Sequence, residues 1–192
     1  CGSPTGGCAS TTICDTVRAY FNSTLEVSIT ADPQIICYGQ SGSVLTANPV
    51  GGTAPYYYLW STGQTSQTIN VTGGGTYTVT LTDDSGCPGV SADITVTEIT
   101  AQPLVDAGVS QSVCIDFLPI QLAATFSNLN GIIWSGGQGS FSNVNIVNST
   151  YTPTQTEIDN GVVTLSIEGF YTNGCPSIYD NVTINLVDYI AD

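Results

Sequence analysis

The sequence predicts an all-β protein made of tandem immunoglobulin-like antiparallel β-sandwich domains. In residues 51–87 an aromatic strand leads through a Ser-Thr-Gly-Gln turn into a strand where Tyr77, Val79 and Leu81 alternate with threonines. Gly-rich turns separate the strand-like runs, and a Gly-Cys pair recurs before several of them. Alternation with a period of two buries one face of a strand, and two sheets that bury such faces against each other form a sandwich.

The first complete domain is expected over residues 25–100. Turn residues and alternating apolar positions predict its strands at 25–30, 43–47, 55–60, 67–71, 76–82 and 92–97. The second domain is expected over residues 101–192, with strands at 118–124, 131–134, 148–151, 162–170 and 182–187. Val163, Leu165 and Ile167 alternate within one of these strands, as one-sided burial requires.

A repeated motif indicates that the domains belong to an array. Gly86-Cys87-Pro88 and Gly174-Cys175-Pro176 each precede an alternating strand, and Gly7-Cys8 does the same near the start of the chain. Residues 1–24 are therefore interpreted as the tail of a preceding repeat; the alternative is that this segment pairs with another chain. The joint at 98–104 is short and contains Pro103, so neighbouring domains are expected to form a semi-rigid rod.

Composition restricts the function. Arg18 is the only basic residue among 192, against 15 acids, so the net charge is -14, yet only 8% of residues are charged. Nothing can neutralise phosphates, which excludes nucleic acid as a partner. Without His or Lys, imidazole and Schiff-base chemistry are excluded, and no enzyme activity, catalytic residue or cofactor is expected. No apolar run reaches the ~20 residues that cross a bilayer, so no membrane insertion is expected within this segment.

The first domain resembles the SprB-type repeats, related to PKD domains, of large surface adhesins in Bacteroidota. The residues that carry this resemblance are Cys37-Tyr38-Gly39, Gly51-Gly52, Pro55-Tyr56, Tyr58, Trp60-Ser61, Gly63, Thr65, Gly75, Tyr77, Val79, Leu81, Asp83 and Gly86-Cys87. The second domain is similar to the PKD-like repeat of the same proteins. It carries Val105-Asp106-Ala107-Gly108, Cys114, Trp134-Ser135-Gly136-Gly137-Gln138-Gly139-Ser140-Phe141, Tyr151-Thr152-Pro153-Thr154, Glu157-Ile158 and Gly174-Cys175.

The resemblance implies export by the type IX secretion route, a cell-surface location, and a role in adhesion or gliding motility. The implied partners are neighbouring repeats of the same chain, and surface glycans or other cell-surface proteins.

Seven widely spaced cysteines in a Thr-rich β chain suggest structural disulfides and a secreted protein. The pairs expected are Cys37–Cys87 and Cys114–Cys175, each closing a loop of ~50–60 residues and adding about 3–4 kcal/mol. Each pair is expected near one pole of its sandwich. Cys1, Cys8 and Cys14 have no assigned partners, and Cys8 is the candidate for pairing outside this segment.

Trp60, Trp134 and Tyr77 are expected in the cores, with sugar stacking as the alternative for the two tryptophans. If Tyr56, Tyr58 and Trp60 face the core, then Tyr57 and Leu59 point outward. Such an apolar pair marks a contact with a neighbour, or is covered by a nearby loop.

Two further features are weaker. Asp83, Asp84, Asp106 and Asp116 could contribute oxygen ligands to Ca²⁺, although turn-forming aspartates are the simpler interpretation. Asp15-Thr16-Val17 fits the Asp-(Ser/Thr)-apolar pattern that Bacteroidota use for O-glycosylation, which makes Thr16 a candidate.

The sequence thus favours a non-catalytic structural or adhesive segment of a large extracellular cell-surface adhesin. Two alternatives remain open. One is a subunit of an extracellular filament or sheath that assembles by strand complementation. The other is a carbohydrate-binding accessory module of a secreted enzyme.

Overall fold

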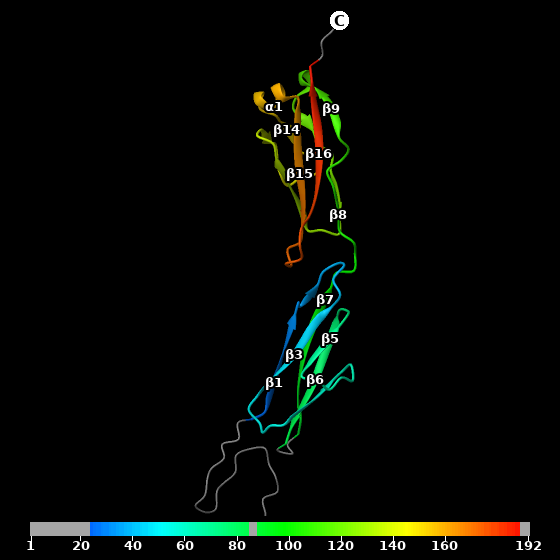
Figure 1. Ribbon diagram of the computed structural model, residues 1–192, viewed down its shortest axis with the longest axis vertical. Helices are drawn as coiled ribbons and strands as arrows, with labels where there is room; N and C mark the ends of the chain where they lie inside the picture. Colours follow the sequence, from blue (N-terminus) through cyan, green and yellow to red (C-terminus); the bar gives the residue numbers. More distant parts are fainter. Residues whose placement is uncertain (1–23, 85–87, 189–192) are drawn as a thin grey trace, which may run out of the picture. The chain divides into compact units, whose positions relative to one another are not determined.

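The computed structural model describes residues 24–84 and 88–188. The chain divides into two compact units, unit 1 (Cys1–Ile99) and unit 2 (Thr100–Asp192). Each unit is a sandwich of mainly antiparallel sheets around its own apolar core, as the ribbon in Figure 1 shows. The predicted fold class, tandem immunoglobulin-like sandwiches, is confirmed.

Unit 1 contains two sheets. The first has the strand order β1-β3-β5, and the second has the order β2-β7-β6-β4. Their strands are β1 (Glu26–Asp32), β2 (Ile35–Ile36), β3 (Ser43–Val50), β4 (Tyr56–Trp60), β5 (Thr68–Val71), β6 (Gly75–Asp83) and β7 (Val90–Glu98).

Alternation along the strands builds the core of unit 1. In β6 the side chains of Val79 and Leu81 are fully buried, while the threonines between them lie on the other face. Leu45 and Ile69 approach from the opposite sheet, so the core lies between the two sheets. Burying one such aliphatic side chain contributes about 1.5–3 kcal/mol to folding.

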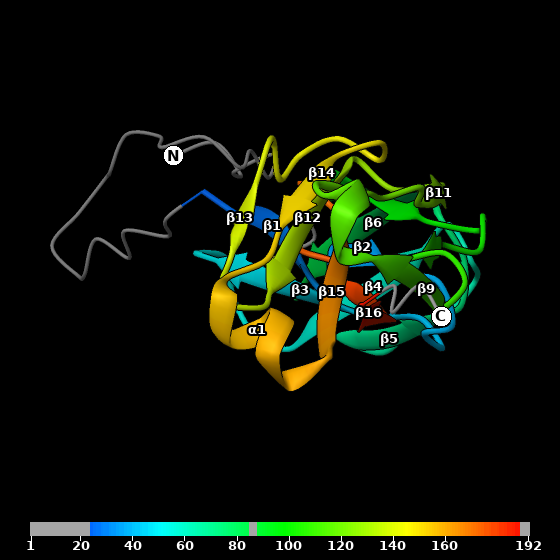
Figure 2. The same ribbon diagram turned by 90° about the horizontal axis from the view of Figure 1, so that it is seen from above.

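Unit 2 contains a long four-stranded sheet, with the order β12-β15-β16-β9, and two smaller sheets, β10-β14-β13 and β11-β8. Its strands are β8 (Leu104–Asp106), β9 (Gln111–Cys114), β10 (Ile120–Gln121), β11 (Thr125–Ser127), β12 (Gly131–Gly136), β13 (Ser140–Phe141), β14 (Thr150–Thr152), β15 (Val162–Phe170) and β16 (Ile178–Val187). A 3-10 turn, η1 (Ile115–Phe117), and one short helix, α1 (Gln155–Asn160), complete it. Figure 2 shows α1 in orange, directly before β15.

One predicted strand is much shorter in the structure. Of residues 118–124, only Ile120 and Gln121 form a regular ladder, with Tyr151 and Thr150. Leu122 and Ala124 still donate backbone hydrogen bonds, at 2.9 and 3.1 Å, to the carbonyls of Ser149 and Val147. The predicted length of this strand was wrong, because the segment with which it pairs is irregular.

The first part of each unit crosses from one sheet to the other. In unit 1, β1 pairs with β3 in antiparallel fashion, and β2 then pairs in parallel with β7, the last strand. In unit 2, β8 pairs with β11, and β9 then pairs in parallel with β16, again the last strand. The same arrangement thus recurs in two units of different sequence.

Candidate functional site

In each unit the candidate mechanical site is the pair of parallel strands, β2 with β7 in unit 1 and β9 with β16 in unit 2. In unit 1, Thr97 N–H donates to the Gln34 carbonyl at 3.0 Å, and Ile99 N–H donates to the Ile36 carbonyl at 2.9 Å. In unit 2 the pair is longer, running from Gln111 beside Ile184 to Cys114 beside Val187.

The direction of these pairs determines how they respond to tension. A force that enters a unit through its first strands and leaves through its last strand pulls two parallel neighbours in opposite directions along their length. Evenly spaced ladder bonds then share the force and must break together. Peeling an antiparallel hairpin from its open end would break the same kind of bond one at a time. The parallel pairs are therefore placed to resist extension.

A buried tryptophan anchors the four-stranded sheet of each unit. Trp60 is 2% exposed and donates Nε1–H to the Ser66 carbonyl at 2.8 Å; Trp134 is 1% exposed and donates to the Ile146 carbonyl at 3.1 Å. The alternative that these tryptophans stack on sugars is wrong, because a buried ring has no exposed face. Tyr77 packs partly buried against the core, and its hydroxyl donates to the Gly73 carbonyl at 2.7 Å.

A buried carboxylate organises one end of unit 2. Glu157 of α1 is 5% exposed. Its Oε1 accepts hydrogen bonds from the Tyr151 hydroxyl and the Gln138 N–H, both at 2.7 Å. Its Oε2 accepts from the backbone N–H and the hydroxyl of Thr154, at 2.8 and 3.0 Å. The Glu157 N–H donates back to the Thr154 hydroxyl, which completes a capping box at the start of α1.

This network also explains the glycines of the 134–141 segment. The Tyr151 hydroxyl accepts from Gly139 N–H at 2.7 Å. A Cβ added at Gly139 would lie 2.0 Å from the Thr152 carbonyl oxygen, and one added at Gly137 would lie 2.0 Å from the Tyr151 hydroxyl oxygen. Only glycine lets the loop close over the Tyr151–Glu157 pair.

The network sets the protonation of its two acids. Burial acts to raise the pKa of Glu157, but the hydrogen bonds from Thr154, Gln138 and Tyr151 outweigh it, so the pKa lies below its ordinary value. Burial, followed by the hydrogen bond to Glu157, raises the pKa of Tyr151. Glu157 is therefore an ionised, fully bonded structural carboxylate.

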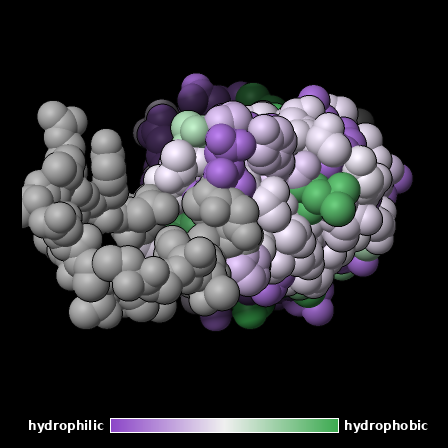
Figure 3. All heavy atoms as spheres, turned by 90° about the horizontal axis from the view of Figure 1, so that it is seen from below, coloured by the Kyte–Doolittle hydropathy of each residue, from purple (hydrophilic) through white to green (hydrophobic). Residues whose placement is uncertain are grey.

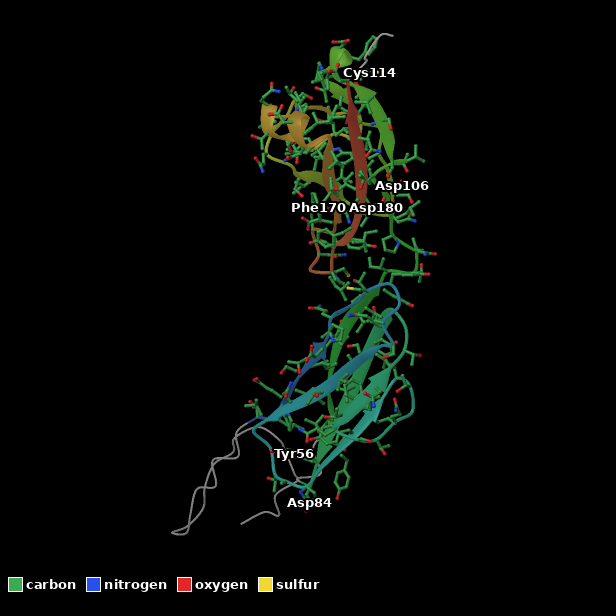
Figure 4. The ribbon with its side chains drawn as sticks, turned by 45° about the horizontal axis from the view of Figure 1, so that its top comes forward. Tyr56, Asp84, Asp106, Cys114, Phe170 and Asp180 are labelled. Atoms are coloured by element: carbon green, nitrogen blue, oxygen red, sulfur yellow. The ribbon has the colours of Figure 1, made fainter. Side chains whose placement is uncertain are left out.

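The structure corrects one predicted disulfide. Cys175 is disulfide-bonded, whereas Cys114 carries a free thiol, so the pair Cys114–Cys175 is wrong. Cys114 lies beside Val187, where β16 ends, while Cys175 precedes Ile178, where β16 begins. Ten residues of strand span ~30 Å, far beyond disulfide reach. Figure 4 shows Cys114 at one end of the unit and Asp180, at the start of β16, toward the other.

Cys37 is also disulfide-bonded. Its expected partner Cys87 lies outside the described residues, so that pair stays a prediction. Cys1, Cys8, Cys14 and Thr16 also lie outside the described residues.

The outer face of β4 carries the apolar pair expected from the sequence. Tyr57 is 54% exposed and Leu59 is 57% exposed, and β4 is the edge strand of its sheet. On that face they lie opposite Thr82 and Thr80 of β6, and the Thr80 hydroxyl is 3.1 Å from the Ser91 hydroxyl of β7. The space-filling view in Figure 3 is mostly white to purple, with separated green areas. Hydroxyl ladders thus replace charges over much of the sheet surface.

Two of the four aspartates considered for Ca²⁺ accept backbone hydrogen bonds. Asp83 is buried and accepts the Thr53 N–H at 2.6 Å, while Asp106 accepts the Gly108 N–H at 2.8 Å. Asp116 belongs to η1. Among residues 24–84 and 88–188, no three His, Cys, Asp or Glu side chains gather closely enough to hold a metal ion. In the same described stretch, no helix has the length and apolar character to cross a membrane.

Comparisons with known proteins give structural likeness only. No family model and no curated protein matches the chain. Three N-terminal domains of the bacteriophage RB49 highly immunogenic outer capsid protein match 84% of this chain at 20% identity, with a TM-score of 0.42. A three-domain immunoglobulin segment of titin matches 84% at 14% identity, with a TM-score of 0.48. Protocadherin gamma B2 cadherin domains 3–6 match 86% at 13% identity, with a TM-score of 0.33. The chain spans 59%, 65% and 49% of those three structures.

Proposed function

We propose that this chain is a non-catalytic structural and adhesive segment of an extracellular protein, whose two sandwiches act as extension-resistant spacers. The observation that carries this proposal is the parallel pairing of β2 with β7 and of β9 with β16. In both units the second strand runs parallel to the last strand, so tension applied through the two ends of a unit would load this pair in shear. This placement suits a domain that is pulled through its two ends.

Surface chemistry supports an extracellular setting. Only 8% of residues are charged, and threonine ladders cover exposed sheet faces, as between Thr76 and Thr95 at 3.1 Å. Cys37 and Cys175 are disulfide-bonded, which fits an oxidising compartment. The sequence resemblance to SprB-type and PKD-like repeats supports the finer proposal of a Bacteroidota surface adhesin exported by type IX secretion, with a role in gliding. Immunolabelling of intact cells tests this: label on the outer surface supports it, and label only after lysis contradicts it.

Single-molecule stretching of the chain tests the spacer role. Val113→Pro removes a backbone N–H from the middle of β9 and should lower the unfolding force of unit 2 clearly. Ile132→Val, in the buried part of β12, is the matched control: it costs about 0.5–1.5 kcal/mol but leaves the β9–β16 pair intact. Its unfolding force should stay close to that of the parent chain. Equal loss of force in both variants would contradict the proposal.

The adhesive part of the proposal rests on Tyr57 and Leu59. An exposed aromatic ring beside an aliphatic side chain, on an edge strand with hydroxyl groups beside it, suits contact with a glycan or a protein surface. A glycan array and a cell-binding assay should show binding that Tyr57→Ala reduces at least tenfold. Tyr179→Ala, which removes a ring that is 65% exposed in unit 2, should leave binding unchanged. Equal effects of the two variants would contradict this assignment.

A further inference from the structure

Three asparagines of this chain are followed by glycine, and all three pairs lie in unit 2. They are Asn130-Gly131, Asn160-Gly161 and Asn173-Gly174. In such a pair the backbone nitrogen of the glycine can attack the side-chain amide carbon of the asparagine, because glycine has no side chain that hinders the approach. An unfolded chain allows this reaction at every pair, so the folded structure decides which pair reacts.

The first pair lies at the start of β12 and is held by its neighbours. Asn130 Oδ1 accepts the Thr172 N–H at 3.0 Å, and the Asn130 N–H donates to the Phe170 carbonyl at 2.9 Å. A Cβ built on Gly131 would lie only 2.7 Å from the ring of Phe170, so the ring covers this glycine closely. Attack requires the Asn130 side chain to swing over the Gly131 nitrogen, and these contacts oppose that movement.

The second pair ends helix α1. The Gly161 N–H donates to the carbonyls of Glu157 and Ile158, both at 3.0 Å, in a left-handed C-terminal cap. A nitrogen whose N–H is shared between two carbonyls must give up both hydrogen bonds before it can lose its proton and attack. The helix cap therefore protects Asn160 from this reaction.

The third pair has the opposite arrangement. Asn173 and Gly174 are exposed, in the loop between β15 and β16. Apart from its chain neighbours, no atom lies within 4 Å of a Cβ built on Gly174, and the Gly174 N–H has no hydrogen bond to any described residue. Asn173 Oδ1 accepts the Cys175 N–H at 3.3 Å, so the side chain folds back over the Gly174 peptide. The same N–H points at the oxygen that gains negative charge when the amide carbon is attacked.

We propose that Asn173 is a site of spontaneous covalent modification, at which the Gly174 nitrogen attacks the side-chain amide and the asparagine is deamidated. A bond forms between the Gly174 nitrogen and Cγ of Asn173, the Cγ–Nδ2 bond breaks, and ammonia leaves with the proton of the Gly174 nitrogen. Water then opens the succinimide ring to aspartate or isoaspartate. The product places a new carboxylate beside the disulfide-bonded Cys175, in a chain whose net charge is already -14. The inference is independent of the spacer role.

Incubation of the intact chain in a mildly alkaline buffer made with heavy-oxygen water tests the proposal. Digestion with chymotrypsin in ordinary water then separates the three asparagines into different peptides, and mass spectrometry measures the heavy oxygen that each gained during the incubation. Label should accumulate at Asn173 several-fold faster than at Asn130 or Asn160, in both aspartate and isoaspartate. Equal rates at the three sites, a faster rate at Asn130 or Asn160, or aspartate as the only product would each overturn the proposal.

An unfolded sample and one variant separate the effect of the fold from that of the local sequence. In urea with a reductant, the three sites should react at similar rates, and a preference for Asn173 that persists unchanged there would overturn the proposal. Gly174→Ala places a methyl group beside the attacking nitrogen and should slow the reaction at Asn173 several-fold. Rates at Asn130 and Asn160 that stay low in this variant report that unit 2 remains folded. An unchanged rate at Asn173 in the folded variant would overturn the proposal.

Discussion

Tyr151 and Glu157 meet in a buried hydrogen bond of 2.7 Å between the phenol oxygen and Oε1 of the carboxylate. Tyr151 comes from β14 and Glu157 from α1, so the bond joins the β10-β14-β13 sheet of unit 2 to helix α1. The same phenol accepts from Gly139, and the same Oε1 accepts from Gln138. This pair therefore fixes the loop after Trp134.

Removing the phenol oxygen should destabilise unit 2 without changing its fold. Tyr151→Phe leaves Glu157 with one donor fewer and leaves the Gly139 N–H without its acceptor, while the ring stays buried. The expected loss is about 1–3 kcal/mol in the free energy of unfolding. Urea denaturation followed by tryptophan fluorescence measures it. A loss below a few tenths of a kcal/mol would show that water replaces the bond at no cost.

The lowered pKa of Glu157 predicts acid sensitivity. Because the folded-state pKa lies below the ordinary value of 4.5, this group stabilises the fold above that value. The contribution is lost as the pH falls through the lower folded-state pKa. Glu157→Gln should cost about 1–3 kcal/mol at neutral pH and little under strongly acidic conditions. Denaturation of both proteins across pH 2–7 should therefore give converging stabilities at the acid end; parallel curves would contradict the prediction.

Gly139 should tolerate no side chain for steric reasons. Gly139→Ala places a Cβ 2.0 Å from the Thr152 carbonyl oxygen, so the loop must move and the network must open. We expect a loss of more than ~2 kcal/mol. Gly174→Ala is the control: its φ of +89° is unfavourable for alanine, but no atom lies within 4 Å, so the cost should be only ~1–2 kcal/mol. Thermal denaturation compares the two, and a larger loss for Gly174→Ala would contradict the assignment.

The cysteines should differ sharply in their effect on stability. Cys175→Ser breaks a disulfide and should cost about 2–4 kcal/mol. Cys114→Ser alters a free, half-buried thiol and should change stability by less than ~0.5 kcal/mol in the monomer. Melting with and without reductant provides the check. Reduction should lower the melting midpoint of unit 2 in the parent chain. It should not lower the melting midpoint of unit 2 in Cys175→Ser any further.

The long strands could be predicted from the sequence because burial of one face makes apolar residues alternate with other residues along each strand. The strand expected at 162–170 matches β15, and the one expected at 76–82 lies inside β6. Some short strands, including β2 and β9, could not be predicted. β2 has two residues and β9 has four, and their partners lie more than 60 residues further along the chain. The local sequence of such short segments does not indicate which distant strand pairs with them.

The candidate site was only partly accessible to sequence reasoning. The outward position of Tyr57 and Leu59 followed from alternation in β4. The Glu157 network had a local signal, since Thr154 and Glu157 have the spacing of a capping box, but its bond to Tyr151 depends on the tertiary fold. The predicted pair Cys114–Cys175 was wrong because spacing along the chain does not say which end of a sandwich a cysteine occupies.

The most direct test of the central claim compares two directions of pulling on unit 2. In the first, handles at Gln111 and Val187 pull β9 and β16 past each other; in the second, handles at Val162 and Val187 separate the adjacent ends of the β15–β16 hairpin. If the parallel pair resists extension, the first geometry should need a several-fold higher unfolding force than the second. Equal forces in the two geometries would contradict the account.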